Sequence, residues 1–399
     1  MCYKNIAMYL RHIFETLQQH LDHKLITVVT GLRRIGKSYA LKHLLSKISS
    51  DNKIYLDLEK AENRYIFNQP HYKDVVISLE IEGVDFSRKA YIALDELQLV
   101  PNITSVIKYL YDTYDIKFLI TGSSSFYLKN HFNESLAGRK TIFEMKPLSF
   151  QEFLWFKEVN FDLSKYAFSD INISLYQKLN VYYREYLTYG GFPEVVLNAK
   201  TEKDKISYLK EIVNAYLQMD LLIAADITKT DEIYSLIRLL SKRIGSKTDL
   251  SKLSSVTGIT RYKLKEYITF LEYTYFIVQV PAYVQNTDRE ISLLKKLYFA
   301  DNGLMTVFGI NDTGALLENS VANQLLFNGE VKYYAKKSGQ EIDFILNEQI
   351  AIEVKETAAI QDLKKLESRA KSIGINNTKL IALNFNKHAD VKYTWAGNV

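Results

Sequence analysis

The sequence predicts an α/β protein in successive parts: a parallel sheet with helices, then a mostly helical middle, then a second and smaller α/β domain. Three observations predict this order. An apolar, β-branched stretch over 25–30 runs into a glycine-rich turn and a helical pattern. From 150 to 240, apolar residues recur at three- and four-residue spacing, which is typical of helices. From 311 to 399 the pattern is helix, three strands, helix and strand.

The composition is that of a globular protein. Of the 399 residues, 47% are hydrophobic and 24% are charged, which excludes a disordered chain. Only 16 glycines and 5 prolines are present, so collagen-like and low-complexity architectures are excluded as well. The single cysteine, Cys2, cannot form an intramolecular disulfide, and no run of about 18 apolar residues exists. We therefore expect a cytoplasmic protein without a membrane span.

A phosphate-binding loop is predicted directly after the first strand. The stretch GLRRIGKS has the spacing G-x-x-x-x-G-K-S between a strand and a helix. Its glycines let backbone N–H groups point at phosphate oxygens, its lysine reaches the β- and γ-phosphates, and its serine ligates Mg²⁺. We therefore expect ATP and Mg²⁺ as cofactors. The predicted nucleotide contacts in and after this loop are Gly31, Arg33, Arg34, Ile35, Gly36, Lys37, Ser38 and Tyr39.

An acidic pair follows a later strand. In YIALDELQ, over 91–98, four mostly apolar residues lead into Asp95 and Glu96. Ligands bind at the carboxyl ends of strands in parallel sheets of this kind. Asp95 is therefore expected to hold the Mg²⁺ with Ser38, and Glu96 to polarise the attacking water as a general base.

Three further residues are candidates for the same site. The strand over 116–124 ends in hydroxyls, and Thr121 and Ser123 either sense the γ-phosphate or hold the water, or they only cap the next helix. Arg139 lies after a short helix and before a strand. An arginine there is a candidate arginine finger acting on a neighbouring subunit's nucleotide, and the alternative is a surface arginine.

With these motifs the chain resembles a known family. GLRRIGKS, LDELQ, LITGSSS, LAGR and PLSFQEF are similar to AAA-type ATPases of archaea and bacteria that carry a C-terminal domain of unknown function. The resemblance continues through YLTYGGFPEVV and KLYFADNGL. It implies a P-loop NTPase core of the AAA+ (ASCE) type, in which the acidic strand is not adjacent in sequence to the P-loop strand, a lid after that core, and Arg139 as the finger candidate.

A winged helix is predicted over 249–281. Helices over 250–257 and 260–273 are joined at Gly258, and a β-rich stretch follows. Residues 242–310 hold ten Lys and Arg against six Asp and Glu. The start of the second helix suits DNA contacts, although a winged helix can also serve only protein packing. The residues in question are Thr260, Arg261, Tyr262, Lys263 and Lys265.

The last ninety residues carry a second acidic motif. Asp343 lies inside one strand, and Glu353 and Lys355 lie on one face of the next strand, because residues i and i+2 share a face. The two carboxylates and Glu318 are candidate metal ligands, and Lys355 is a candidate for orienting the water. This D-x9-E-x-K pattern resembles the PD-(D/E)XK nuclease superfamily, with Ile342 in place of the motif's proline. The alternative is an inactive nuclease-like fold kept for binding.

The sequence therefore predicts four regions: a P-loop ATPase core (1–150), a helical lid (151–240), a winged helix (241–305) and a PD-(D/E)XK nuclease-like domain (306–399). The expected function is Mg²⁺-dependent ATP binding and hydrolysis, coupled to C-terminal domains that bind duplex DNA and are candidates for cleaving it. The alternative is an ATP-driven regulatory switch or scaffold with an inactive nuclease-like domain. A homo-oligomer is a further expectation, since a finger acts in trans.

Overall fold

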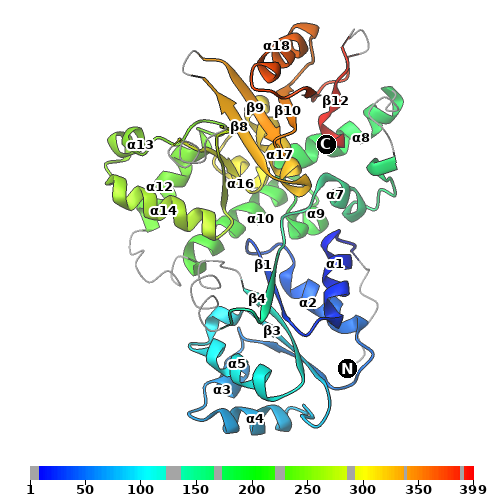
Figure 1. The fold of residues 1–399 in the computed structure, drawn as a ribbon, viewed down its shortest axis with the longest axis vertical. Helices are drawn as coiled ribbons and strands as arrows, with labels where there is room; N and C mark the ends of the chain where they lie inside the picture. The colour runs from blue at the N-terminus through cyan, green and yellow to red at the C-terminus, as the bar shows by residue number, and fades with distance from the viewer. Residues whose placement is uncertain are drawn as a thin grey trace. The chain divides into compact units, whose positions relative to one another are not determined.

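The structure is a computed structural model that describes residues 9–122, 136–165, 173–220, 230–284, 293–336, 339–386 and 391–399 (Figure 1). The chain forms two compact units. Unit 1 contains residues 1–146 with the short segments 218–226 and 273–275. Unit 2 contains 147–217, 227–272 and 276–399.

Unit 1 is built on a five-stranded parallel sheet with the order β2-β3-β4-β1-β5. Strand β4 lies between β1, which precedes the predicted phosphate loop, and β3, which ends in the acidic pair. The parallel α/β architecture expected for the first part of the chain is therefore confirmed. The strands are β1 (Ile26–Thr30), β2 (Lys53–Asp57), β3 (Ala90–Asp95), β4 (Ile116–Gly122) and β5 (Lys140–Glu144).

Helices cover both faces of this sheet, and its strands are accordingly apolar on both sides. Val28, Leu94 and Ile120 pack into one core with helices α3 to α5. Their strand neighbours, such as Val29 and Leu119, are fully buried as well, and α2 contacts β2, β3 and β4. The helices are α1 (Ile13–Gln19), α2 (Lys37–Lys47), α3 (Ala61–Phe67), α4 (Tyr72–Ile81) and α5 (Ile103–Thr113).

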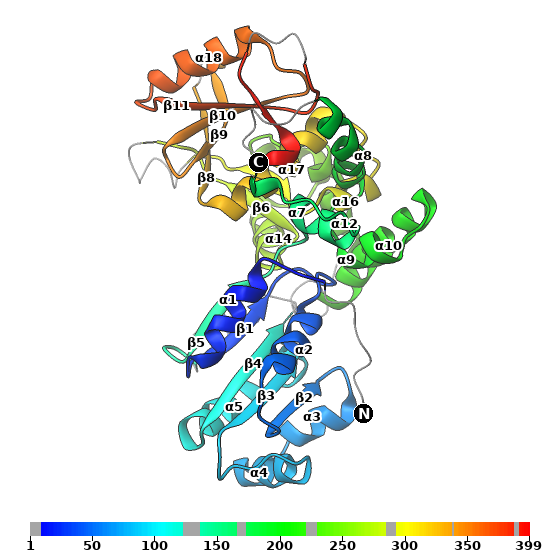
Figure 2. The same cartoon turned by 90° about the vertical axis from the view of Figure 1, so that its right-hand side faces the viewer.

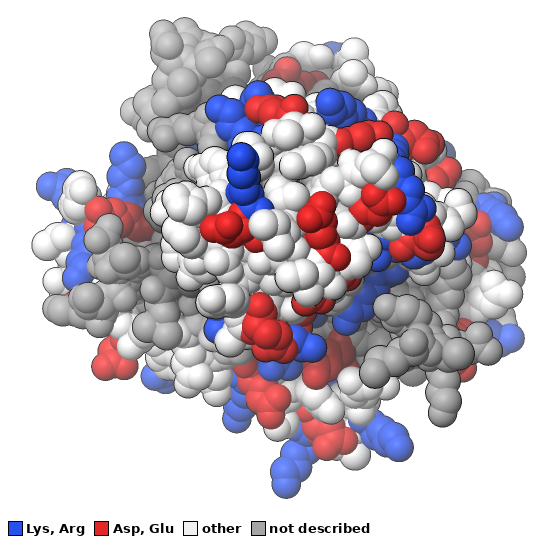
Figure 3. Space-filling view, turned by 90° about the horizontal axis from the view of Figure 1, so that it is seen from below, with Lys and Arg blue, Asp and Glu red and all other residues white. Residues whose placement is uncertain are grey.

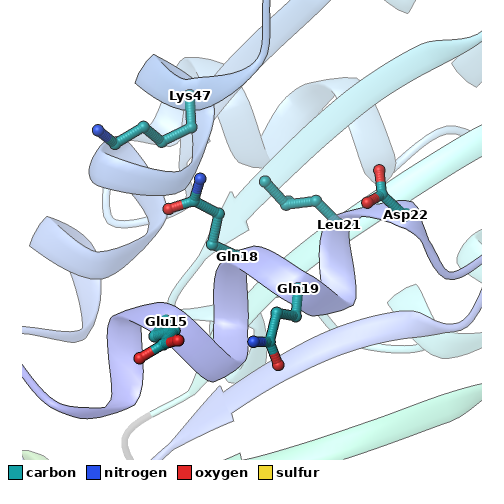
Figure 4. Close-up of a pocket in the computed structure, with 6 residues that line it drawn as sticks. All are labelled: Glu15, Gln18, Gln19, Leu21, Asp22 and Lys47. Carbon is teal, nitrogen blue, oxygen red and sulfur yellow. The ribbon is translucent and has the colours of Figure 1, made fainter.

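A shallow polar depression lies between α1 and the last turn of α2 (Figure 4). It is lined by Glu15, Gln18, Gln19, Leu21, Asp22 and Lys47. Lys47 is the last residue of α2, whereas the predicted phosphate loop meets the first residue of that helix. The depression is therefore at the opposite end of α2 from the candidate nucleotide site, and we assign it no role.

Unit 2 begins with helices, as the apolar periodicity predicts. They are α7 (Phe150–Phe156), α8 (Ile173–Tyr189), α9 (Pro193–Asn198), α10 (Glu202–Ala215) and α12 (Thr230–Ser241). Two further helices, α13 (Leu250–Thr257) and α14 (Arg261–Tyr273), are followed by an antiparallel pair of strands, β6 (Ile277–Val280) and β7 (Lys296–Phe299). Gly258 ends α13 in the left-handed conformation, as expected for a turn between helices.

The rest of unit 2 is a second α/β layer. Its sheet has the order β12-β11-β10-β9-β8, antiparallel from β8 to β10 and parallel from β10 to β12. Helix α18 lies along one face and buries Leu366 and Ala370 against Ile345 and Ala351 (Figure 2). The elements are α16 (Asn302–Val307), α17 (Thr313–Asn328), β8 (Val331–Ala335), β9 (Glu341–Leu346), β10 (Ile350–Lys355), α18 (Ile360–Lys371), β11 (Asn377–Ala382) and β12 (Thr394–Trp395).

Two motifs of the helical part meet in the core of unit 2. The buried Asp301 carboxylate, which caps α16, accepts hydrogen bonds from the backbone N–H of Gly191 and of Gly303, each at 2.7 Å. A Cβ added to Gly190 would lie 1.7 Å from Asp301 Oδ1, so only glycine fits there. The glycine pair in GGFP therefore packs against the aspartate in ADNGL, and this contact accounts for both motifs.

Acidic and basic side chains are interspersed on the face shown in Figure 3. Among the described residues, no helix has the length and apolar character needed to cross a membrane.

Candidate nucleotide site and a second carboxylate site

The phosphate loop depends on glycine at both ends. Gly31 has φ 144°, and a Cβ there would lie 2.1 Å from the carbonyl oxygen of Met145. Gly36 has φ 96° and directly precedes the first residue of α2. A side chain at either position would strain the backbone, and at the first it would also push the loop away from β5. The loop thus leads into the amino end of a helix, where anions bind.

Lys37 is folded over the loop that precedes it. Its ammonium donates to the carbonyl oxygens of Gly31 (3.1 Å) and Leu32 (2.9 Å), and the residue is 5% exposed. A lysine held this way lies at the loop that would receive phosphate. To reach a phosphate oxygen it has to exchange these bonds to carbonyl oxygens.

Asp95 lies at the carboxyl end of β3 and is held by hydroxyls from both neighbouring strands. Tyr55 of β2 donates to its Oδ2, and Thr121 of β4 donates to its Oδ1. The Ser38 side chain lies close enough to the Tyr55 phenol to lower the pKa of that phenol. Burial, and then the charge of Asp95, raise the pKa of the Tyr55 phenol. Tyr55 therefore holds Asp95 and lies close to Ser38, the two residues predicted to hold Mg²⁺.

Sequence reasoning missed Tyr55. The available signal was positional: β2 pairs with β3 so that Asp57 lies beside Asp95, and Tyr55 lies two residues earlier on the same face. Finding it requires knowing that these strands are neighbours.

Glu96 follows Asp95 in the left-handed conformation, with φ 58°. Its backbone N–H donates to the Thr121 hydroxyl (3.0 Å), and its carboxylate accepts a hydrogen bond from Gln98. Burial raises the pKa of the Glu59 carboxyl, and the nearby charge of Glu96 raises it further. The carboxyl ends of β2 and β3 thus collect several acidic groups, as the sequence predicts for Asp95 and Glu96.

Thr121 serves the acidic pair. Its hydroxyl donates to Asp95 and accepts from the backbone of Glu96, so it holds both residues in place. The other hydroxyl candidate, Ser123, lies outside the described residues.

The remaining loop residues take different positions. Arg33 forms an ion pair with Glu59 at 3.8 Å, and Arg34 has φ 63°. Ile35 is fully buried, and its carbonyl accepts from the guanidinium of Arg11 (3.1 Å). Tyr39, on the first turn of α2, lies against Phe14 with ring centroids 6.1 Å apart. Ile35 therefore has a packing role, whereas the two arginines lie within the loop and Tyr39 lies on the helix that follows it.

Arg139 lies at the other edge of the sheet. It directly precedes β5, which is parallel to β1, whereas the phosphate loop follows the carboxyl end of β1. Five strand residues separate the two edges, roughly 16 Å at 3.3 Å per residue. The guanidinium forms a two-point ion pair with Asp112, at 2.8 and 3.0 Å. Arg139 is thus placed away from the phosphate loop of its own chain.

Of the candidate residues at the start of α14, the second helix of the predicted winged helix, one is paired within unit 2 and the others are exposed. Thr260, Arg261, Tyr262 and Lys265 are exposed. Lys263 instead forms an ion pair with Glu232 of α12 at 3.3 Å. Exposed basic and hydroxyl groups at the start of α14 remain available to a partner.

The second acidic motif comes together where β9 and β10 pair. The Asp343 carboxylate of β9 accepts from the backbone N–H of Val354 (2.8 Å), and Lys355 forms an ion pair with Glu353 at 2.8 Å. Arg369 of α18 lies 3.8 Å from the same carboxylate. Burial, and then the charge of Asp343, raise the pKa of Glu353, and burial raises that of Asp343. The two carboxylates therefore share one buried environment.

Glu318, the third candidate metal ligand, contacts two residues of β7. Its carboxylate accepts from the Tyr298 hydroxyl (2.8 Å) and is 3.6 Å from the ammonium of Lys296. Both partners are on β7, outside the segment predicted as the nuclease-like domain. Burial raises the pKa of Glu318, and the charge of Lys296 opposes this. The sequence reasoning missed Lys296 and Tyr298.

The protein offers two carboxylates to a metal at the second site. In the described part of the chain, no three His, Cys, Asp or Glu side chains are grouped to hold an ion. Glu353 Oε2 is buried without a hydrogen-bond partner, so one oxygen is unused. Mg²⁺ is commonly bound by one or two carboxylates and keeps several waters. Asp343 and Glu353 fit such an ion, and Ser38 with Asp95 offer the same class of oxygen ligand at the first site.

Comparisons with known families agree with the first of these sites. Residues 23–154 match a family model described as an AAA domain, which confirms the AAA-type core expected from the motifs. Residues 180–314 and 313–395 match models described as domains of unknown function (DUF8612 and DUF4143). The nuclease-like and winged-helix assignments stay predictions.

Relatives that match most of the chain are described as uncharacterized proteins. An uncharacterized protein of Methanocaldococcus jannaschii is 29% identical over 387 residues, covering 92% of this chain and 84% of that protein. An uncharacterized protein of Haemophilus influenzae is 28% identical over 363 residues, covering 86% of each chain. The similarity thus extends through both units.

Similarity to solved structures is weaker. The Orc1 protein of Aeropyrum pernix, solved in complex with DNA, has a TM-score of 0.33 and 12% identity, covering 75% of this chain and 92% of that one. The RuvB Holliday junction branch migration motor of Thermotoga maritima has a TM-score of 0.35 and 13% identity, covering 68% and 90%. Similarity at this level carries no conclusion about fold or function.

Proposed function

We propose that the protein binds ATP with Mg²⁺ and hydrolyses it in unit 1. One observation supports this proposal: the glycine-rich loop follows β1 and Asp95 ends β3, at the carboxyl ends of two strands of one parallel sheet that are separated only by β4. A phosphate-binding loop and an acidic pair at the carboxyl edge of the same parallel sheet are two of the parts that ATP hydrolysis uses.

Each residue has a separate role in this proposal. Backbone N–H groups from Gly31 to Ser38 bind phosphate oxygens, and Lys37 binds the β- and γ-phosphates. Ser38 and Asp95 hold the Mg²⁺, which when bound neutralises charge on the phosphate oxygens. Glu96 accepts the proton of the water whose oxygen attacks the γ-phosphorus, while the bond from that phosphorus to ADP breaks. Thr121 keeps Asp95 and Glu96 aligned.

Two substitutions test this assignment. Lys37→Ala should abolish ATP binding or turnover, because the cation that binds the phosphates is removed. Glu96→Gln should still bind ATP but turn it over at least about 100-fold more slowly, in the range typical of a lost general base. Binding of a fluorescent ATP analogue and release of phosphate measure the two effects. If Glu96→Gln hydrolyses ATP at the parent rate, the general base has been misassigned.

We further propose that unit 2 contains a divalent-metal site that acts on DNA phosphodiesters. The pairing of β9 with β10 supports this proposal, since it brings Asp343 beside Glu353 and Lys355. The carboxylates hold the metal, and the Lys355 ammonium orients the water and stabilises charge on the phosphate. The exposed Arg261 and Lys265 at the start of α14 are candidates for binding the duplex. ATP turnover in unit 1 would regulate this activity.

Metal-dependent nicking of supercoiled plasmid tests the proposal. The parent protein should nick in Mg²⁺ or Mn²⁺, and Lys355→Ala should not. Lys332→Ala is a matched control, because Lys332 is a buried lysine of the same sheet that pairs with Glu330 and Glu348 instead. Equal nicking by Lys355→Ala would assign the activity to another site or to a contaminant. Absence of nicking with every metal and DNA form favours the regulatory switch with an inactive nuclease-like domain.

A further inference from the structure

Lys296 is a buried lysine that belongs to the carboxylate site of unit 2, although it comes from outside the segment that carries the motif. It is the first residue of β7, and its side chain is only 3% exposed. Its ammonium pairs with Glu318 of α17, at 3.6 Å, and with Glu341 of β9. It also lies over the ring of Tyr333, 5.4 Å from the centroid. A long, charged side chain is rarely this deeply buried unless it is paired.

The carboxylates of this region lie in a row with two ends, and a different lysine pairs with the carboxylates at each end. At one end Lys355, 2.8 Å away, neutralises Glu353. At the other, Glu318 and Glu341 share the single positive charge of Lys296. Asp343 lies between the two ends and is acted on by the charges of both lysines. Buried charges are tolerated when paired, and each end meets that condition separately.

At the end that contains Lys296, protein groups contact the Glu318 carboxylate. The Glu318 carboxylate also accepts from the Tyr298 hydroxyl at 2.8 Å. A Cβ added to Gly245 would lie 2.4 Å from Glu318 Oε1, so the backbone before α13 packs directly against this carboxylate. The other end differs, because Glu353 Oε2 is buried and has no hydrogen-bond partner. An oxygen ready for a ligand is therefore found at Glu353.

We propose that Lys296 is a built-in counter-ion that occupies the place a second divalent cation would take between Glu318 and Glu341. The site then accepts a single divalent cation, at Asp343 and Glu353, and Glu318 binds the lysine and not the metal. The Lys296 ammonium comes from the strand pair that follows α14. One of the groups that define the site therefore lies outside the D-x9-E-x-K motif. This inference rests on the metal site proposed above.

The number of bound Mn²⁺ ions tests the proposal. The nucleotide-free full-length chain is titrated with Mn²⁺, and free Mn²⁺ is followed by electron paramagnetic resonance. The parent protein should bind one ion that Asp343→Asn abolishes, and Lys296→Met should bind two. Lys332→Met is the matched control and should bind one, because Lys332 is also buried and pairs with two glutamates. Lys296→Arg keeps the charge and should also bind one.

A second measurement, the unfolding temperature, applies if Lys296→Met does not fold without metal. If Lys296→Met is unstable without metal, its unfolding temperature should rise with Mn²⁺ by more than that of Lys332→Met, because the metal replaces the lost ammonium. One Mn²⁺ in Lys296→Met, or an equal rise in both variants, overturns the inference. If the parent protein binds no Mn²⁺ that Asp343→Asn removes, the proposed metal site itself is overturned. The failure of the inference and the failure of the metal site are therefore distinguishable.

Discussion

The buried Asp301 carboxyl predicts that the stability of unit 2 depends on pH. The carboxyl is buried, and burial raises its pKa from 3.8 to about 7 although two backbone N–H groups donate to it. At a pH between these two pKa values, Asp301 has lost its carboxyl proton in the unfolded chain and retains it in the folded chain. Rising pH therefore favours the unfolded chain, and the stability of unit 2 falls from about pH 4 to pH 7 and then levels off.

The magnitude follows from the two pKa values. One unit of pKa corresponds to about 1.4 kcal/mol, so the full effect of a shift from 3.8 to about 7 is about 4 kcal/mol. Between pH 5 and pH 8 about 2.5 kcal/mol of this should appear as a loss of stability. Asp301→Asn removes the titration. Because an amide has one acceptor where the carboxylate used two, it also loses a hydrogen bond, by an amount that does not depend on pH.

Tryptophan fluorescence during urea unfolding measures this effect in unit 2 alone. The chain has two tryptophans, Trp155 and Trp395, and both belong to unit 2. The difference in unfolding free energy between the parent and Asp301→Asn should fall by about 2.5 kcal/mol from pH 5 to pH 8, since other titrating groups cancel in the difference. If the two plots of stability against pH are parallel, Asp301 is ionised at pH 5 in the folded protein and the reasoning is refuted.

Two further predictions concern the nucleotide site. Tyr55→Phe should raise the Mg²⁺ concentration for half-maximal ATP turnover by about 10-fold, as is typical when a residue that orients metal ligands is lost. ATP-analogue binding in EDTA should not change, and an unaltered Mg²⁺ dependence would leave Tyr55 with a packing role only. Arg139→Ala should lower turnover without weakening ATP binding, whereas Asp112→Asn, which frees the arginine, should retain it. A turnover per subunit that does not vary with protein concentration would exclude a finger acting in trans.

Residues that lie in or directly after a strand could be predicted from the sequence. The phosphate loop and the Asp95–Glu96 pair were found because glycine spacing and a carboxylate after an apolar run are local signals. In unit 2, α17, β8, β9, β10, α18 and β11 follow the predicted order of helix, three strands, helix and strand, for the same reason. The pairing of Asp343 with the backbone of Val354 also follows from antiparallel register, once β9 and β10 are neighbours.

What could not be predicted was the grouping of segments far apart in the chain. The helices over 150–240, the α13–α14 pair and the final sheet form one compact unit, and no local pattern indicates that. Trp395, near the C-terminus, packs edge-on against Phe150 and Tyr183, whose own segments read only as amphipathic helices. Burial among distant residues depends on tertiary packing, which one sequence does not display.

Both candidate sites show the same division of labour. At the first, Asp95 is held by Tyr55, from a strand that contains no motif. At the second, the charge of Lys296, from a strand outside the D-x9-E-x-K motif, acts on Asp343. In each case the group that would react is specified by a local pattern, but the group that orients or neutralises it comes from the neighbouring element. Variation at such supporting positions would alter metal dependence while leaving both motifs intact, so an intact motif alone does not establish activity in this chain.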